Sequence, residues 1–73
     1  MNILILGGGG YVGTPLTQKL LENKKNKITV VDTFWFGNYL QKHKNLKILK
    51  KDIRNVVKKD LLKIDCIMHL ASI

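Results

Sequence analysis

Cysteine is almost absent from this chain: Cys66 is the single one among 73 residues, so no disulfide can form within the chain. No Cys/His cluster shows the spacing of zinc ligands, so the sequence pattern gives no metal site. No apolar run approaches the roughly 20 residues that a membrane span needs, and no basic segment with a cleavage site precedes the glycines. These absences predict a cytoplasmic protein without a membrane partner.

Acidic residues are also scarce. The chain has 5 Asp and Glu against 13 Lys and Arg, and its formal net charge is +8. The lysines are spread along the sequence in pairs such as Lys24-Lys25 and Lys58-Lys59, at positions expected on solvated faces. Because charge alone gives only non-specific attraction to polyanions, we interpret them as a lysine-rich surface and not as a specific nucleic-acid site.

The length allows one small domain at most. A chain of this size buries only about 60–65% of the surface that its unfolded form exposes. Hydrophobic burial and ordering entropy nearly cancel at this size. Its stability therefore has to come from packing, a cofactor, an oligomer or further chain.

Strand-like and helix-like segments alternate along the sequence. Short apolar or alternating runs predict four strands, at residues 3–6, 28–31, 46–50 and 66–70. Such alternation favours right-handed crossovers and a parallel sheet, so the predicted fold class is α/β. With the first strand in the centre, the expected order is 3-2-1-4, as in the N-terminal part of a Rossmann-like doubly wound sheet.

A spacing of four between apolar residues predicts a helix after the first strand. Proline is tolerated only within the first helical turn, so Pro15 places the expected start close to Gly10 or Tyr11. The residues of the expected apolar face are Val12, Leu16 and Leu20, with Leu21 beside them.

A second helix is expected between the third and fourth strands. Its apolar positions are Val57, Leu61 and Ile64. Asp52 or Asn55 is placed to cap it, since a carboxylate or amide oxygen accepts from the first free N–H groups of a helix.

The strongest motif is the glycine run between the first strand and the first helix. Gly8, Gly10 and Gly13 fit the pattern G-x-G-x-x-G, and Gly7 with the last two fits G-x-x-G-x-x-G. The first glycine allows a sharp turn, the middle one lets a pyrophosphate approach the backbone, and the third lets the helix pack closely. Free N–H groups near Tyr11 and Val12 would then meet the phosphate charge, so this loop predicts a dinucleotide site.

Asp32 supports that reading because it ends the second strand, 19 residues beyond Gly13. An acidic residue at about this distance accepts hydrogen bonds from the adenosine ribose, and its charge repels a 2′-phosphate. NAD is therefore favoured over NADP, although Asp32 could also be a simple turn residue. A P-loop is excluded because Thr14 stands where that motif requires lysine.

Four segments in register resemble the extended short-chain dehydrogenases/reductases, the NAD-dependent sugar-nucleotide epimerases and dehydratases. Gly7 to Gly13 is similar to their GGAGYIG loop. The segment from Asp32 to Asn38 resembles their ribose-side Asp-Asn-x-x-x-Gly, and Asp52 to Arg54 resembles their Gly-Asp-Ile-Arg. His69 to Ser72 resembles their His-Leu-Ala-Ala, so the resemblance covers essentially the whole chain.

The resemblance implies roles for particular residues in holding the adenosine end of NAD. Asp32 and Thr33 would lie along the ribose. Asp52 would accept a hydrogen bond from the adenine amino group, with the Ile53 backbone beside it, although Asp52 could instead cap the following helix. The complete set of expected cofactor residues is Gly7, Gly10, Tyr11, Val12, Gly13, Asp32, Thr33, Asp52, Ile53, Leu70 and Ala71.

The last motif leaves an alternative open. Leu70 and Ala71 would line the pocket over the adenosine, but they could equally be packing residues at a strand end. His69 has no Cys, Asp or second His at ligand or triad spacing, so we interpret it as structural.

The family's catalytic pair, Tyr-x-x-x-Lys, is missing. Tyr11 is followed four residues later by Pro15, and Tyr39 by His43. The resemblance implies an enzyme, yet these 73 residues contain no candidate catalytic residue and no metal ligand set.

We therefore expect residues 1–73 to be the N-terminal, adenosine-binding part of an NAD-binding Rossmann domain, without its catalytic and substrate parts. In the complete protein the partner would be a nucleotide sugar, with epimerase, dehydratase, reductase and decarboxylase all open. A truncated piece, a split gene and a natural fragment all fit. The uncovered edge of the fourth strand predicts self-association or a completing chain. The alternative is a non-catalytic nucleotide-binding or dimerising module.

Overall fold

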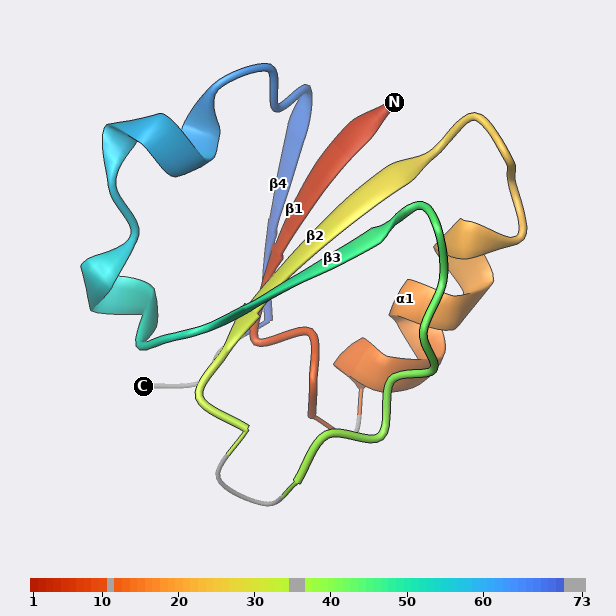
Figure 1. Ribbon diagram of the computed structural model, residues 1–73, viewed down its shortest axis with the longest axis horizontal. Helices are drawn as coiled ribbons and strands as arrows, with labels where there is room; N and C mark the ends of the chain where they lie inside the picture. The colour runs from red at the N-terminus through yellow and green to blue at the C-terminus, as the bar shows by residue number, and fades with distance from the viewer. Residues whose placement is uncertain (11, 35–36, 71–73) are drawn as a thin grey trace.

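The computed structural model describes residues 1–10, 12–34 and 37–70. Its centre is one parallel sheet of four strands in the order β3-β2-β1-β4 (Figure 1). This order confirms the predicted α/β class and the 3-2-1-4 arrangement. The strands are β1 (Asn2–Leu6), β2 (Lys27–Asp32), β3 (Leu46–Lys50) and β4 (Cys66–His69).

The strand register places apolar residues of all four strands side by side across the sheet. Ile5 of β1 lies opposite Val30 of β2 and Met68 of β4, and Val30 lies opposite Ile48 of β3. These side chains share one face of the sheet because alternate residues of a strand point to the same side. That face carries the main core, whose fully or nearly buried members are Ile3, Ile5, Leu21, Ile28, Val30 and Leu40.

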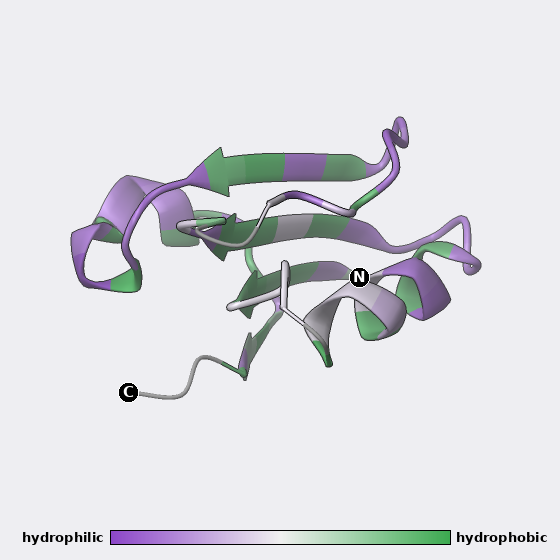
Figure 2. Cartoon of the chain, turned by 90° about the horizontal axis from the view of Figure 1, so that it is seen from below, coloured by the Kyte–Doolittle hydropathy of each residue, from purple (hydrophilic) through white to green (hydrophobic). Residues whose placement is uncertain are grey.

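One α-helix, α1 (Gly13–Leu21), covers this face (Figure 2). The sequence placed its start at Gly10 or Tyr11, two or three residues too early. The Thr14 N–H does donate to the Gly10 carbonyl at 2.9 Å, but Pro15 has no N–H to continue the ladder at the next residue. Regular helix therefore begins only at Gly13. Within the described ranges, no helix is both long and apolar enough to cross a membrane.

The buried face of α1 differs from the predicted one by one residue. Gly13, Thr17 and Leu21 are buried, whereas Val12 is 68% exposed. Of the predicted face, Leu16 is half-buried and Leu20 packs against the core, so only its first residue, Val12, is turned outward. Thr17, which the apolar pattern did not include, is fully buried in the helix–sheet contact.

The predicted second helix is replaced by two short 3-10 turns, η1 (Ile53–Asn55) and η2 (Lys58–Leu61). Val56 and Val57 separate them with extended backbone, which β-branched side chains favour. Val57 is 52% exposed, so its spacing to later apolar residues does not mark a buried face.

The two turns pass over the face of the sheet opposite α1 (Figures 1 and 2). Leu4 of β1 and Val31 of β2 point to that face and are fully buried. Lys51 and Asp60 form an ion pair that ties the end of β3 to η2. The sheet therefore has α1 on one face and irregular chain over part of the other, where Leu4 is buried but Ile67, its partner on β4, is 52% exposed.

Thr17 generates a stability prediction. Its side chain is fully buried, and its hydroxyl has no hydrogen-bond partner among the described residues. Thr17→Val removes that unpaired hydroxyl without changing the shape, so we expect a gain of about 1 kcal/mol in the free energy of unfolding. Denaturant unfolding measures it. Thr17→Ser keeps the hydroxyl and loses the methyl, so it should destabilise the chain; a Val variant no more stable than the parent would contradict the prediction.

Candidate functional site

The glycine loop leaves β1 through a turn that requires glycine. Gly7 has a φ of 84°, in the left-handed region that side chains disfavour. Its N–H donates to the Val31 carbonyl of β2 at 2.8 Å, so the turn starts while the chain is still paired to the sheet. The loop is thereby fixed at the carboxyl ends of the two central strands.

Gly13 brings the helix against this loop more closely than a side chain would allow. A Cβ at Gly13 would lie 2.5 Å from the Gly8 Cα and 2.6 Å from the Gly7 carbonyl oxygen. Both neighbours are backbone atoms, which cannot turn aside as a side chain could. The third glycine of the motif therefore has the close-packing role that the pattern predicts.

The space beside Gly10 is open among the described residues. A Cβ there would meet only the Gly7 carbonyl oxygen, at 3.8 Å, so no contact within the described part of the chain requires glycine at this position. The N–H groups of Val12 and Gly13 find no acceptor among the described residues. Free N–H groups at the start of a helix, beside an open stretch of backbone, form a cradle for an anion.

Asp32 is held at the edge of this cradle. Its Oδ2 accepts from the Gly9 N–H at 3.0 Å, and its Oδ1 accepts from the Phe34 N–H at 2.8 Å. A carboxylate has about four acceptor positions, so about two remain for a ligand. The Asp32 carbonyl also accepts from the Lys51 N–H at 3.0 Å, which places the end of β3 beside it.

Asp52 has the capping role that was its alternative interpretation, although the element it caps is η1. Its Oδ1 accepts from the Arg54 N–H at 2.8 Å, and its Oδ2 accepts from Arg54 Nη2 at 2.7 Å. These hydrogen bonds to the Arg54 side chain and backbone lower the pKa of Asp52 to about 2. The adenine contact expected of Asp52 stays a prediction.

The remaining predicted residues lie at the same end of the sheet where the structure describes them. The Leu70 N–H donates to the Leu6 carbonyl at 2.8 Å, so Leu70 is adjacent to the start of the glycine loop. Thr33 and Ile53 are half-buried beside Asp32 and Asp52 in the chain. Tyr11 and Ala71 lie outside the described residues.

Sequence reasoning missed one pair of residues at the loop, Gly9 and Phe34. A Cβ at Gly9 would clash with Phe34 Cε1 and lie 2.7 Å from Cδ1. Neither glycine pattern requires glycine at this position. Gly9, the third of four consecutive glycines, was the available signal, since a glycine that no motif explains often marks a close approach.

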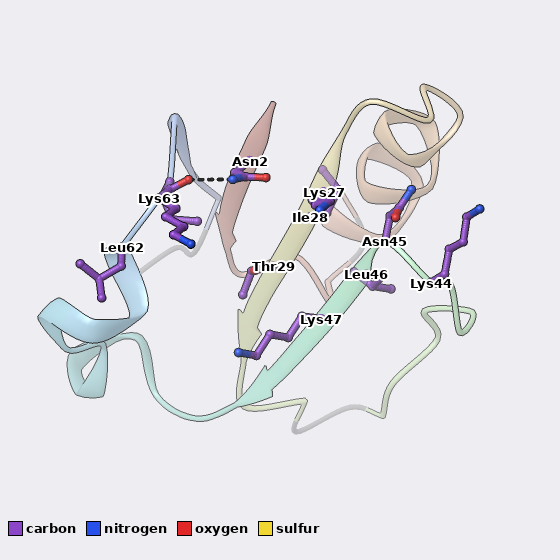
Figure 3. Close-up of a pocket in the computed structure, with 11 residues that line it drawn as sticks. Asn2, Lys27, Ile28, Thr29, Lys44, Asn45, Leu46, Lys47, Leu62 and Lys63 are labelled. Carbon is purple, nitrogen blue, oxygen red and sulfur yellow. Dashed lines mark hydrogen bonds between the residues drawn. The ribbon is translucent and has the colours of Figure 1, made fainter.

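A groove of about 390 Å³ lies far from this site, at the amino ends of the strands (Figure 3). Asn2 begins β1 there and donates from its side chain to the Lys63 carbonyl at 2.9 Å. The groove has no glycine loop and no carboxylate among its lining residues, so it does not fit a pyrophosphate and ribose. The part of the chain that the structure describes also holds no group of three metal-ligating side chains.

Gly10 and Gly13 should respond differently to the same substitution. Gly13→Ala puts a Cβ against backbone, so we expect a loss of about 1–3 kcal/mol in the free energy of unfolding. Gly10→Ala meets only open space and should leave the free energy of unfolding nearly unchanged. Urea unfolding of both variants measures this, and equal destabilisation of the two would contradict the packing described.

Arg54→Gln tests the electrostatics of the Asp52 cap. Without the guanidinium, the pKa of Asp52 should rise from about 2 toward its ordinary value of 3.8. Because the folded-state pKa is lowered, the stabilising contribution is present above pH 3.8 and is lost as the pH falls toward 2. Carboxyl NMR titration measures the pKa, with Lys19→Gln as a control at a different ion pair. An unmoved Asp52 pKa would contradict the assignment.

Comparison with known proteins agrees with this geometry. The sequence model of the 3-beta hydroxysteroid dehydrogenase/isomerase family matches residues 4–73. UDP-glucuronic acid decarboxylase 3 of Arabidopsis thaliana is 37% identical over 76 residues, covering 97% of this chain and 21% of the decarboxylase. UDP-glucose 4-epimerase of Streptococcus mutans is 29% identical over 77 residues, covering 99% of this chain and 23% of the epimerase.

A solved structure has the same arrangement of strands and helix. The crystal structure of UDP-glucuronic acid 4-epimerase from Bacillus cereus in complex with NAD superposes with a TM-score of 0.89 at 32% identity. The match covers 100% of this chain and 28% of that one. This chain therefore spans about a fifth to a quarter of the length of the relatives that it matches.

The residues present fit an NAD molecule on two structural grounds. The space where a Gly10 side chain would lie is open beside free helix N–H groups, as a pyrophosphate requires. Asp32 keeps acceptor capacity at the end of β2, as a ribose requires. These two features agree with the family match. Related members of the extended short-chain dehydrogenases/reductases are NAD-dependent epimerases and decarboxylases. The chain belongs to the 3-beta hydroxysteroid dehydrogenase/isomerase family within that group, and it covers the N-terminal part of the fold.

Proposed function

We propose that this chain binds the adenosine diphosphate half of NAD at the carboxyl ends of β1 and β2. The observation that carries the proposal is the position of Asp32, which accepts from the Gly9 N–H at 3.0 Å and therefore lies directly beside the glycine loop. The proposed ribose acceptor, Asp32, is thus hydrogen-bonded to the loop that would hold the phosphates. The complete protein would be an NAD-dependent enzyme that acts on a nucleotide sugar.

The pyrophosphate would rest on the loop at Gly10. The free N–H groups of Val12 and Gly13 would donate to its oxygens, and the positive end of the α1 dipole would add favourable charge. Gly7 and Gly13 do not need to touch the phosphate: their role is to hold the backbone in the position that exposes these donors.

The ribose would hydrogen-bond to the remaining acceptor positions of Asp32, with Thr33 beside it. Two vicinal hydroxyls match two carboxylate oxygens, each of which already accepts one backbone N–H. A 2′-phosphate at this place would bring negative charge against an ionised carboxylate. The site therefore favours NAD over NADP.

The adenine would lie near the carboxyl end of β3, where Asp52 and the Ile53 backbone would face its amino edge. Leu70 and Ala71, which follow β4 at the other edge of the sheet, would line the pocket over the adenosine and its phosphates. Arg54 now donates to both Asp52 oxygens, but its side chain is 83% exposed and can turn into solvent to free an acceptor. Nothing else in the described contacts of Asp52 opposes that exchange.

NAD would supply hydride transfer at its nicotinamide ring, and this chain's contribution would be to anchor and orient the opposite end. No Tyr-x-x-x-Lys pair occurs in the 73 residues, so the proton-transfer groups would come from other parts of the complete protein. The nucleotide-sugar substrate is proposed because the matched relatives are named for UDP-sugar reactions.

The proposal extends to the edge of β4. This strand ends the sheet, and Ile67 on it is 52% exposed. An open strand edge with an apolar side chain favours pairing with a further strand, either of the same protein or of a second copy. A cytoplasmic location is part of the proposal, and it is supported by the single free cysteine, Cys66.

Calorimetric titration of the chain with NAD and NADP tests the proposed function. We expect NAD to bind more tightly than NADP, and Asp32→Asn to weaken NAD binding about tenfold or more, since hydrogen bonds to a charged acceptor contribute about 1.5–3 kcal/mol. Gly10→Ala should weaken binding as well, because its Cβ occupies the phosphate cradle.

Glu22→Gln is the matched control, because it removes one negative charge at the exposed end of α1, far from the loop. Its NAD affinity should equal that of the parent chain. A folded chain that does not bind NAD, or an Asp32→Asn variant with unchanged affinity, would refute the proposed function.

A further inference from the structure

The ring of Phe34 fills the space in which a residue other than glycine would place its side chain at position 9. A Cβ at Gly9 would clash with Phe34 Cε1, lie 2.7 Å from Phe34 Cδ1, and lie 3.1 Å from Asp32 Oδ2. The first two atoms belong to a ring that also packs against the main core, so the ring cannot simply move aside. Gly9 is therefore glycine because of Phe34, and not because of a phosphate.

Phe34 is held in a backbone conformation that bulky residues rarely adopt. Its φ is 55°, in the left-handed region. Three contacts maintain this conformation: its N–H donates to Asp32 Oδ1 at 2.8 Å, its carbonyl accepts from the Gly37 N–H at 3.0 Å, and its ring packs on the core. Strain of this kind persists only where the surroundings fix it, and it is concentrated at functional sites.

Both members of the pair also hold the carboxylate of Asp32. The Gly9 N–H binds Oδ2 and the Phe34 N–H binds Oδ1, so each oxygen is fixed by one residue of the contact. If the ring and the loop separate, the two N–H groups separate too. The orientation of the carboxylate then depends on how closely the ring sits on Gly9.

We propose that Phe34 is a positioning residue: by seating its ring on Gly9, it sets the distance between the glycine loop and the end of β2 and so aims the free acceptor positions of Asp32 at the ribose. This inference rests on the proposed function, since it assigns Asp32 to NAD. Phe34 itself acts through Asp32 and through the loop, without forming the site's polar contacts to the cofactor.

A double-mutant cycle tests the pair. Gly9→Ala should weaken NAD binding about tenfold or more and lower the melting temperature, because its Cβ and the Phe34 ring cannot occupy the same space. Phe34→Ala should also weaken NAD binding. In the Phe34→Ala background, Gly9→Ala should change affinity by no more than about twofold, because the clash is gone. Additive effects would overturn the pairing.

A second readout separates positioning from mere packing. In Phe34→Ala the ratio of NAD to NADP affinity should fall, because a carboxylate that is not aimed at the 2′ position repels the phosphate less. Phe34→Tyr keeps the ring edge on Gly9 and should keep both the affinity and the ratio. A Phe34→Ala chain with a lower melting temperature but the parent's NAD affinity and selectivity would reduce Phe34 to a packing residue and overturn the proposal.

Two controls keep the outcome decisive. If Phe34→Ala does not fold, Phe34→Asn replaces it in the cycle, since asparagine adopts the left-handed region readily and also removes the ring. Melting temperatures measured without nucleotide test the contact independently of binding. A folded parent chain that fails to bind NAD refutes the proposed function and this inference with it, whereas a parent that binds NAD with an uncoupled cycle refutes this inference alone.

Discussion

The backbone contact between Gly13 and the turn at Gly7 and Gly8 is the constraint on which the rest of the structure depends. Because no side chain fits between them, α1 approaches the carboxyl end of β1 as closely as two backbones can. That approach rotates the helix so that Gly13, Thr17 and Leu21 face the sheet. It also turns Val12 outward and leaves its N–H without an acceptor in the described part of the chain, so the proposed anion cradle would be a consequence of the packing.

The charge beside this contact is opposite in sign to the charge of the chain as a whole. The chain as a whole is strongly basic, yet the residue placed at the cradle is a carboxylate whose oxygens are held by two backbone N–H groups. Fixed dipoles can hold a negative group there without neutralising it, which leaves it able to accept from hydroxyls. Asp52 differs, since Arg54 neutralises it at the surface. In the proposed complex the two carboxylates at this end of the sheet would therefore differ: Asp32 would accept from the ribose as it stands, whereas Asp52 would first have to release Arg54.

The sheet was predictable from sequence and the connections were less so. Apolar runs such as Ile28 to Val31 have buried residues on both faces of the sheet, and a continuous apolar run of this kind predicts a strand directly. The glycine loop after the first strand indicated the Rossmann-like strand order. The predicted helix after Asp52 was wrong because its first apolar position, Val57, lies in extended chain and is 52% exposed, which no local pattern reveals. The face of α1 was predicted in part: Leu20 and Leu21 pack on the core, but an apolar pattern could not identify the buried Thr17 or the exposure of Val12.

The contact of Phe34 with Gly9 was missed for a different reason: the unexplained glycine could mark a close approach, but only the three-dimensional structure shows that Phe34, from another loop, is the residue that approaches it. A site built from backbone N–H groups depends on the path of the chain more than on side-chain identity. Residues that fix the path therefore determine binding even when they never meet the ligand. Gly13 does so by its lack of a side chain, and Phe34 does so by occupying the space that Gly9 leaves empty. In the proposed site, the apolar ring of Phe34 thus determines the orientation of the Gly9 and Phe34 N–H groups and of the Asp32 carboxylate that they hold.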